Sequence, residues 1–378
     1  MVVVPEVKAD KRDAKAEIRQ NVKQALFLAK CLHAGHPKFR DSEPTDISSI
    51  ELQTSGDIGP DAPVLPAQYV LLTKGDPDNP LAMVVHGFLE TADTMRYVVS
   101  DLADAGYYAV APYIRGAYPT QSDLTQPQSA LTYLIQDLVE LTFQLADPTQ
   151  ENVFLGSDFG SIAGQVVMAV QPEPFYKKFV SFGNIAPLPA TEVAFSNFEG
   201  FRGFFFGGGF FQIAPSLGIF FRDEAVNQFR TMDLFADLWA YLDPFGSNPT
   251  DLAFAEMSWL ATDTSLENGL NYPRGLYLAP VPPISFPQPA LYVVNKLDGG
   301  LVWPSNKEKF DEVRRVSEAT KVGGPDTIKF AEMPCSGHFP QIEDPDKLRR
   351  IILRFLDRHG HHSRHDPRGP RHGHYSHY

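Results

Sequence analysis

Short apolar runs alternate with amphipathic stretches from residue 68 onward. The runs are almost continuously apolar, which is typical of strands buried on both faces of a sheet, and the stretches between them carry apolar residues at helical spacing. Strands separated by helices indicate an α/β fold, with a mostly parallel central sheet and helices on both faces. The pattern predicts strands at 69–73, 81–85, 107–111, 153–155, 179–182, 290–294 and 327–330, and helices at 92–105, 129–146, 161–170, 307–317 and 345–357.

The alternation is interrupted once, between residues 184 and 290. About one hundred residues intervene, far more than the roughly 12–15 residues of a long loop, so 185–289 is expected to form a subdomain. It is rich in Gly and Pro and holds 15 of the 28 Phe, including Phe204, Phe205, Phe206, Phe210 and Phe211. Most of these rings are expected to form the core of the insertion itself, and some to line a pocket beneath it.

The two ends of the chain differ from the alternating part. Residues 1–62 are expected to form a helical arm, with one apolar stripe on a charged helix over 8–30, and a connecting segment with a short strand at 50–53. Residues 359–378 carry 7 of the 11 His and almost nothing apolar, which predicts a disordered tail without the fixed spacing of a metal site. The core is therefore expected over 63–184 and 290–358.

Composition and charge narrow the classes of function. The 378 residues include 33 basic and 46 acidic ones, and this formal net charge of −13 argues against nucleic-acid binding. Only Cys31 and Cys335 could pair, and two cysteines are no disulfide framework for a chain of this length, which favours a reducing compartment. No signal-peptide core is recognisable, and no run approaches the roughly 18 apolar residues of a membrane span. We therefore expect a cytoplasmic protein without a membrane span, and the oligomeric state stays open.

The most informative segment is Gly156-Ser157-Asp158-Phe159-Gly160, between a predicted strand and a predicted helix. Glycines two residues before and after Asp158 are typical of a nucleophile elbow, where a strained turn holds its central residue out at the strand end. An alternative is that Asp158 only caps the helix, a role that suits Asp well. A carboxylate nucleophile forms an ester, and hydrolysis of that ester requires a base and oxyanion donors.

Residues elsewhere in the chain supply these further groups. Asp298 follows the strand at 290–294, and His338 lies on the loop before the last helix. The order Asp158, Asp298, His338 is that of nucleophile, acid and histidine in an α/β-hydrolase. His86-Gly87-Phe88 follows the strand at 81–85, so the backbone N–H groups of Phe88 and Phe159 are the expected oxyanion hole, while His86 is expected to be structural.

These motifs give the chain, over about 68–355, a resemblance to the α/β-hydrolase superfamily, in its branch of epoxide hydrolases and haloalkane or haloacetate dehalogenases. The resemblance rests on 86–90 (HGFLE), 111–116 (APYIRG), 156–160 (GSDFG) and 337–343 (GHFPQIE). It implies the α/β-hydrolase fold, with 185–289 as a lid inserted after the sixth core strand and a small apolar substrate between lid and sheet. It also implies a reaction that needs no metal or other cofactor.

The choice within this branch depends on what stabilises the leaving group. Epoxide hydrolases protonate the leaving oxygen with lid tyrosines, one of them in an Asn-Trp/Tyr-Tyr-Arg motif. Here Asn271-Tyr272-Pro273-Arg274 places Pro273 at that position, so Tyr272, Tyr241 or Tyr277 takes over the role, or epoxide chemistry is lost. Tyr118 is a further candidate.

Haloalkane dehalogenases instead hold the halide with an indole N–H beside the nucleophile. The corresponding positions here are Phe159 and Phe88, without a side-chain donor, but Trp239 or Trp259 in the lid could supply one, and Arg115 could bind a substrate carboxylate if it is not structural.

The sequence thus predicts an epoxide hydrolase in which Asp158 forms an alkyl ester and His338, held by Asp298, activates the water that hydrolyses it. A dehalogenase is the alternative within this branch. A non-catalytic binding protein on the same scaffold is the alternative from another class, because a fold alone does not guarantee chemistry.

Overall fold

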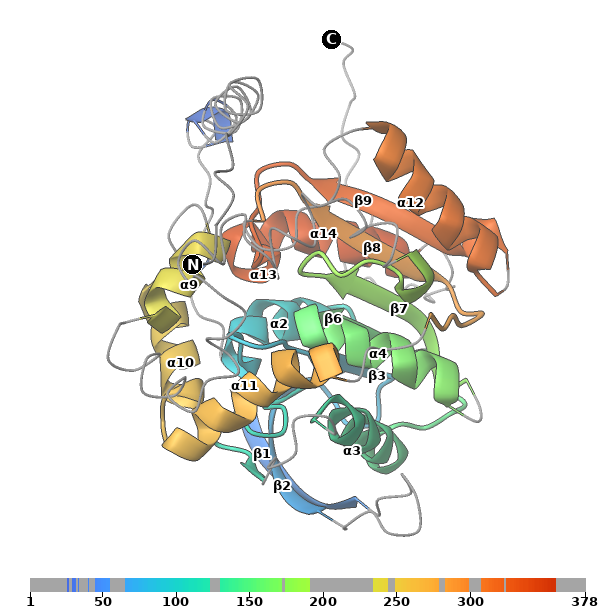
Figure 1. Ribbon diagram of the computed structural model, residues 1–378. Helices are drawn as coiled ribbons and strands as arrows, with labels where there is room; N and C mark the ends of the chain where they lie inside the picture. Colours follow the sequence, from blue (N-terminus) through green and yellow to red (C-terminus); the bar gives the residue numbers. More distant parts are fainter. Residues whose placement is uncertain are drawn as a thin grey trace, which may run out of the picture.

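A mostly parallel sheet forms the centre of the protein in the computed structural model (Figure 1). The structure describes residues 26, 29–31, 33, 40, 45–54, 65–122, 130–171, 174–190, 234–243, 249–278, 283–298, 307–322 and 324–357. Within these ranges the strand order is β1-β2-β4-β3-β6-β7-β8-β9, and β5 pairs with β2. The strands are β1 (Asp46–Thr54), β2 (Leu65–Lys74), β3 (Leu81–Val85), β4 (Tyr108–Pro112), β5 (Gln121–Ser122), β6 (Asn152–Ser157), β7 (Tyr176–Phe182), β8 (Ala290–Asn295) and β9 (Ile328–Met333).

In the order of the sheet, neighbouring strands from β4 through β3, β6, β7 and β8 to β9 run parallel. β2 is antiparallel to both β1 and β4. Every residue of β3, β6 and β8 is buried, which explains why these strands appear in the sequence as continuous apolar runs. β1 lies in the expected connecting segment, so the sheet begins at Asp46 and the strand expected at 50–53 is its edge strand.

Helices cover both faces of the sheet (Figure 1). One apolar layer contains α3 (Ala130–Leu145) and α4 (Asp158–Val170), and the opposite layer contains α2 (Arg96–Asp104) and α14 (Pro345–Asp357). The remaining elements of the core are α12 (Lys307–Thr320), the one-turn helix α13 (Pro340–Glu343), and the 3-10 turns η1 (Ala92–Met95), η3 (Leu188–Ala190) and η5 (Pro325–Thr327). The predicted α/β architecture is therefore confirmed.

Between β7 and β8, where the lid is expected, the described residues form three α-helices. They are α9 (Leu234–Leu242), α10 (Pro249–Trp259) and α11 (Asp263–Leu278), the yellow to orange helices of Figure 1. The Phe- and Gly-rich stretch at 201–211 lies outside the described residues, as do the tail at 359–378 and most of the predicted helix at 8–30. The expected Phe core of the insertion and the disordered tail therefore remain predictions.

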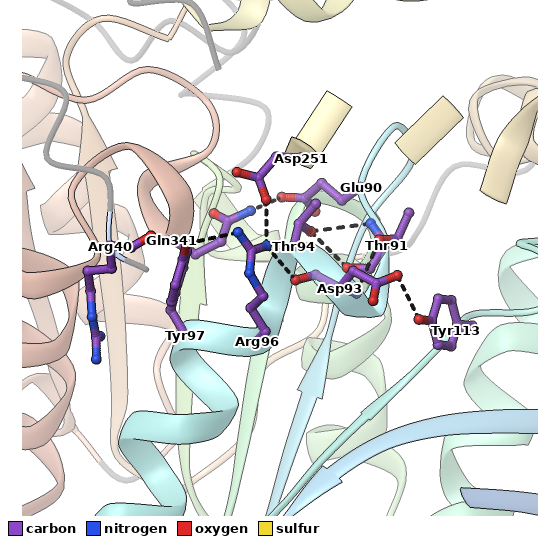
Figure 2. Close-up of polar contacts among 10 residues, drawn as sticks. All are labelled: Arg40, Glu90, Thr91, Asp93, Thr94, Arg96, Tyr97, Tyr113, Asp251 and Gln341. Atoms are coloured by element: carbon purple, nitrogen blue, oxygen red, sulfur yellow. Dashed lines mark hydrogen bonds and ion pairs between the residues drawn. The ribbon is translucent and has the colours of Figure 1, made fainter. Parts of the chain in front are cut away.

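Polar contacts hold α10 on the core. The guanidinium of Arg96 on α2 lies 2.5 Å from the carboxylate of Asp251 on α10, and both side chains are buried (Figure 2). The backbone N–H of Tyr118 donates to the carbonyl of Ser258 at 3.1 Å. Moving α10 away from α2 would break this buried ion pair and leave an uncompensated charge. The Arg96–Asp251 pair therefore holds α10 in its position against α2.

Two sites tie the N-terminal arm to the core. Cys31 and Cys335 form a disulfide across 304 residues of sequence. The guanidinium of Arg40 pairs with the carboxylate of Asp101 on α2 at 3.0 Å. The backbone carbonyl of Arg40 accepts the hydroxyl of Tyr97 at 2.6 Å (Figure 2). The two cysteines, which by their number do not indicate a disulfide framework, are therefore paired, because the fold brings Cys31 beside Cys335 although 304 residues separate them in the sequence.

Disulfides persist mainly in oxidising compartments, so the cytoplasmic location remains a prediction and this pairing argues against it. No helix among the described residues is both long and apolar enough to cross a membrane.

The disulfide predicts a redox-dependent stability. Protein purified without reductant should show no reactive thiol under denaturing conditions, and two after reduction, because Cys31 and Cys335 are the only cysteines. Reduction should lower the free energy of unfolding by about 2–4 kcal/mol, since the cross-link restricts the unfolded chain. Thiol titration and urea unfolding with and without dithiothreitol measure both effects. The Cys31→Ser/Cys335→Ser variant should not respond to reductant; two reactive thiols in the unreduced wild type would contradict the assignment.

Candidate active site

The turn between β6 and α4 has the geometry of a nucleophile elbow. Asp158 is the first residue of α4, and its φ of +45° lies in the left-handed region that residues other than glycine rarely adopt. A Cβ on Gly156 would lie 2.5 Å from the carbonyl oxygen of Gly160, and one on Gly160 would lie 2.2 Å from that of Val85. Both positions therefore require glycine, for the steric reason that the sequence pattern suggests.

The side chain of Asp158 is buried beside the predicted oxyanion donors. The backbone N–H of Phe88 donates to Asp158 Oδ2 at 3.3 Å, and the N–H of Phe159 also interacts with this carboxylate. Burial raises the pKa of Asp158 to about 7, helped by Glu90 and Asp298 and opposed by His338 and the Phe159 N–H. The structure thus brings Asp158, Phe88 and Phe159 together as the sequence predicts.

His338 and Asp298 form a buried pair at the carboxyl ends of neighbouring strands. His338 Nδ1 lies 2.7 Å from Asp298 Oδ2, and the two residues follow β9 and β8. Burial lowers the pKa of His338, but the charge and hydrogen bond of Asp298 and the charges of Asp158 and Glu90 together raise it to about 10. The predicted acid, histidine and nucleophile are therefore electrostatically coupled in one site.

Glu90 is a further buried acid, to which the sequence interpretation assigns no role. Its carboxylate accepts the N–H of Gly87 at 2.6 Å, the hydroxyl of Ser157 at 2.7 Å and the side-chain amide of Gln341 at 2.8 Å. Figure 2 shows Glu90 and Gln341 beside the Arg96–Asp251 pair. Burial raises the pKa of Glu90, and His338 and the three donors oppose this change. The only signal in the sequence is an acid three residues after His86-Gly87.

Aromatic side chains surround these polar groups. The rings of Phe88 and Trp259 lie 5.5 Å apart, and those of Phe159 and Tyr272 lie 5.7 Å apart. Trp239 on α9 stacks on Phe339, the neighbour of His338, with 4.4 Å between the ring centroids. Both residues that are predicted to carry the oxyanion donors are therefore in contact with aromatic residues of α10 and α11.

The lid residues expected to stabilise a leaving group have different positions. Tyr272 lies beside Phe159, but its hydroxyl donates to the carbonyl of Arg115 at 2.8 Å. Tyr241 and Tyr277 belong to α9 and α11, and their side chains lie outside the described part of the structure. α11 continues through Pro273. None of the three is thus placed against Asp158 by a described contact.

The residues considered for halide or carboxylate binding have structural partners. Trp259 donates its indole N–H to the carbonyl of Glu90 at 2.8 Å. Arg115 is fully buried and forms a bidentate ion pair with Asp137 on α3, at 2.6 and 2.7 Å.

Two further residues named in the sequence analysis lie apart from these contacts. Tyr118 is 53% exposed. His86, as expected, has a structural role: its ring contacts the carbonyl of Gly87 and accepts the N–H of Ile114.

No group of three or more His, Cys, Asp or Glu side chains within the described ranges is arranged to hold a metal ion.

Comparison with known proteins supports the assignment of the fold. No family model matches the chain. It is 32% identical over 90 residues to epoxide hydrolase A of Mycobacterium tuberculosis, covering 23% of this chain and 27% of that protein. It is 23% identical over 299 residues to epoxide hydrolase 1 of Siraitia grosvenorii, covering 74% and 92%. The crystal structure of epoxide hydrolase A from Mycobacterium thermoresistibile matches with a TM-score of 0.61 at 18% identity, covering 83% of this chain and 98% of that one. The chain has the α/β-hydrolase fold, as its sequence motifs predict.

The charge arrangement predicts how the histidine responds to a change in its partner. Asp298→Asn should lower the pKa of His338 from about 10, because it removes the charge that raises this pKa most while the opposing burial remains. NMR titration of histidine-labelled protein measures the shift. Glu312→Gln, a substitution at an exposed position on α12, should leave the pKa of His338 unchanged. A His338 pKa that is equal in wild type and Asp298→Asn would show that the two side chains are not paired.

Proposed function

We propose that this protein is an epoxide hydrolase that converts a small apolar epoxide and water into a vicinal diol through an ester on Asp158. The observation that carries the proposal is the elbow itself: a buried carboxylate, not a hydroxyl or thiol, occupies the strained turn and faces the N–H of Phe88. The similarity to proteins named epoxide hydrolases supports the same activity.

The first step joins Asp158 to the substrate. One carboxylate oxygen of Asp158 attacks an epoxide carbon, a C–O bond of the ring breaks, and the released oxygen takes a proton from a lid phenol. The carboxylate must be ionised to react, and with a pKa of about 7 it is ionised in a large fraction of molecules at neutral pH. The aromatic rings around it exclude water and favour an apolar substrate.

The second step hydrolyses the ester. Ester formation removes the negative charge of Asp158, one of the charges that raise the pKa of His338, so the imidazole becomes easier to deprotonate. The imidazolium returns its proton to the phenolate left by the first step, and the neutral His338 then takes a proton from water as the hydroxide attacks the carboxyl carbon of Asp158. The N–H groups of Phe88 and Phe159 stabilise the oxyanion. Its collapse breaks the bond between the carboxyl carbon and the alkyl oxygen, which takes the proton of the new carboxyl group, and the diol leaves. Asp298 keeps the imidazole oriented throughout.

The phenol that protonates the leaving oxygen is one of Tyr272, Tyr241 and Tyr277. In the structure Tyr272 links α11 to the loop after β4, because its hydroxyl donates a hydrogen bond to the backbone carbonyl of Arg115. It can serve as the acid only if it exchanges this bond for one to the substrate. Tyr241 and Tyr277 are placed on lid helices and are equal candidates.

Dehalogenation is supported less well, because the indole N–H of Trp259 is directed to a backbone carbonyl and Arg115 is paired with Asp137. Trp239 is then the lid tryptophan on which halide binding would depend. A binding protein without catalysis would not need the strained Asp158 or the buried His338–Asp298 pair, which cost free energy to maintain.

A substrate panel with matched tyrosine variants tests the activity. Wild type should convert aryl and alkyl epoxides to diols, and Asp158→Ala should be inactive. One of Tyr272→Phe, Tyr241→Phe and Tyr277→Phe should lose about 10²-fold or more in rate with epoxides, as expected for removal of a general acid. Chromatography of the products measures these rates. Turnover of haloacetates or haloalkanes but of no epoxide, or full epoxide activity in all three tyrosine variants, would refute the proposal.

A further inference from the structure

The loop that carries His338 is held by a buried carboxylate that the proposed mechanism does not use. Glu343, on the one-turn helix α13, accepts the backbone N–H of Gly337 with one oxygen and that of Phe339 with the other, the latter at 3.0 Å. The hydroxyl of Ser336 also donates to Glu343, at 3.2 Å. The backbone N–H groups of both sequence neighbours of His338 are therefore bound by one side chain.

The same loop is aligned with the strand end that carries Asp298. The N–H of Leu297, the residue before Asp298, donates to the carbonyl of Ser336 at 3.0 Å. Ser336 thus bonds through its hydroxyl to Glu343 and through its carbonyl to the neighbour of Asp298. A shift of the loop relative to Glu343 would change the 2.7 Å contact between His338 and Asp298.

The lid holds the loop from the other side. The N–H of His338 itself donates to the carbonyl of Leu242, the last residue of α9, at 3.0 Å. Asp243 follows at once; it is buried, and its charge acts on Glu343. Three successive backbone N–H groups are thereby bound, two by Glu343 and one by the lid.

A carboxylate suits this position because of its number of acceptors. Glu343 is buried and receives three donors on two oxygens, and only an acceptor with two oxygens can bind the N–H groups on both sides of His338. An amide offers one oxygen, and its NH2 group would oppose the second N–H. Burial and the Asp243 carboxylate raise the pKa of Glu343, while the N–H groups and Ser336 lower it. Burial and the charge of Asp243 both disfavour an ionised acid at this position, so the presence of Glu343 indicates a role beyond packing.

We propose that Glu343 is a positioning residue for His338, holding the imidazole in register with Asp298 so that it activates water against the Asp158 ester. The inference rests on the proposed function for its kinetic consequence, but not for its geometry. His338 acts as base only in the second step, so a loop that is held less firmly should slow ester hydrolysis and leave ester formation almost unchanged.

Rapid-quench mass spectrometry of the intact protein, with styrene oxide as the probe, separates the two steps. In Glu343→Ala the ester on Asp158 should decay about 10²-fold more slowly than in wild type, as expected for a misplaced catalytic group, while it forms at a rate within a few-fold of wild type. Glu343→Gln, which keeps one acceptor oxygen, should lie between the two and also serves if the Ala variant does not fold. His338→Gln provides the reference for a trapped ester.

Asp101→Ala is the matched control, because it removes another buried, hydrogen-bonded carboxylate away from this loop. It should lower stability without slowing ester decay. Ester decay at the wild-type rate in both Glu343 variants, or an equal slowing in Asp101→Ala, would overturn the proposal.

A second readout needs no substrate. NMR titration should show a lower His338 pKa in Glu343→Ala than in wild type, because the contact with Asp298 that raises it is loosened. If no epoxide labels Asp158 in wild type or in His338→Gln, the proposed function fails, and the titration alone then decides the positioning role. An unchanged His338 pKa in that case would overturn it as well.

Discussion

The backbone of Asp158 is forced into the left-handed region by the close approach of β6, α4 and β3. No side chain fits at Gly160 against the carbonyl of Val85, or at Gly156 against the start of α4, so strand and helix meet at a turn that only this sequence pattern allows. The turn directs the carboxylate to the N–H of Phe88, which follows β3, the strand beside β6 in the sheet. Every other part of the site is placed relative to this point.

Electrostatics follow from burying this carboxylate. Asp158, Asp298 and Glu90 are three buried acids around one imidazole, and their charges outweigh the burial that would otherwise keep His338 neutral. Each acid has a distinct set of donors: Asp158 the oxyanion N–H groups, Asp298 the histidine, and Glu90 the residues Gly87, Ser157 and Gln341. In the proposed reaction, the loss of one negative charge on ester formation therefore lowers the pKa of the imidazole, as the second step requires.

The sequence predicts the features that depend on local pattern. Strands buried on both faces are continuous apolar runs, and the elbow and the order of Asp158, Asp298 and His338 are visible because each lies at a strand end. Features that depend on distant contacts are not predictable in this way. The Cys31–Cys335 disulfide spans almost the whole chain, and the hydroxyl of Tyr272 finds the carbonyl of Arg115 only once lid and core are folded together. Glu90 and Glu343 lie inside the recognised motifs, but their hydrogen bonds to the nucleophile turn and to the histidine loop form only in the folded protein.

The central claim is that Asp158 is esterified and then regenerated by water. A single turnover of an epoxide in 18O-labelled water, followed by digestion and mass spectrometry of the peptide that contains Asp158, tests it most directly. The account predicts one 18O atom in the Asp158 carboxylate and an unlabelled diol from this first turnover, because water attacks the carboxyl carbon of the ester. A labelled diol with an unlabelled Asp158 would show that water attacks the substrate directly and would contradict the account.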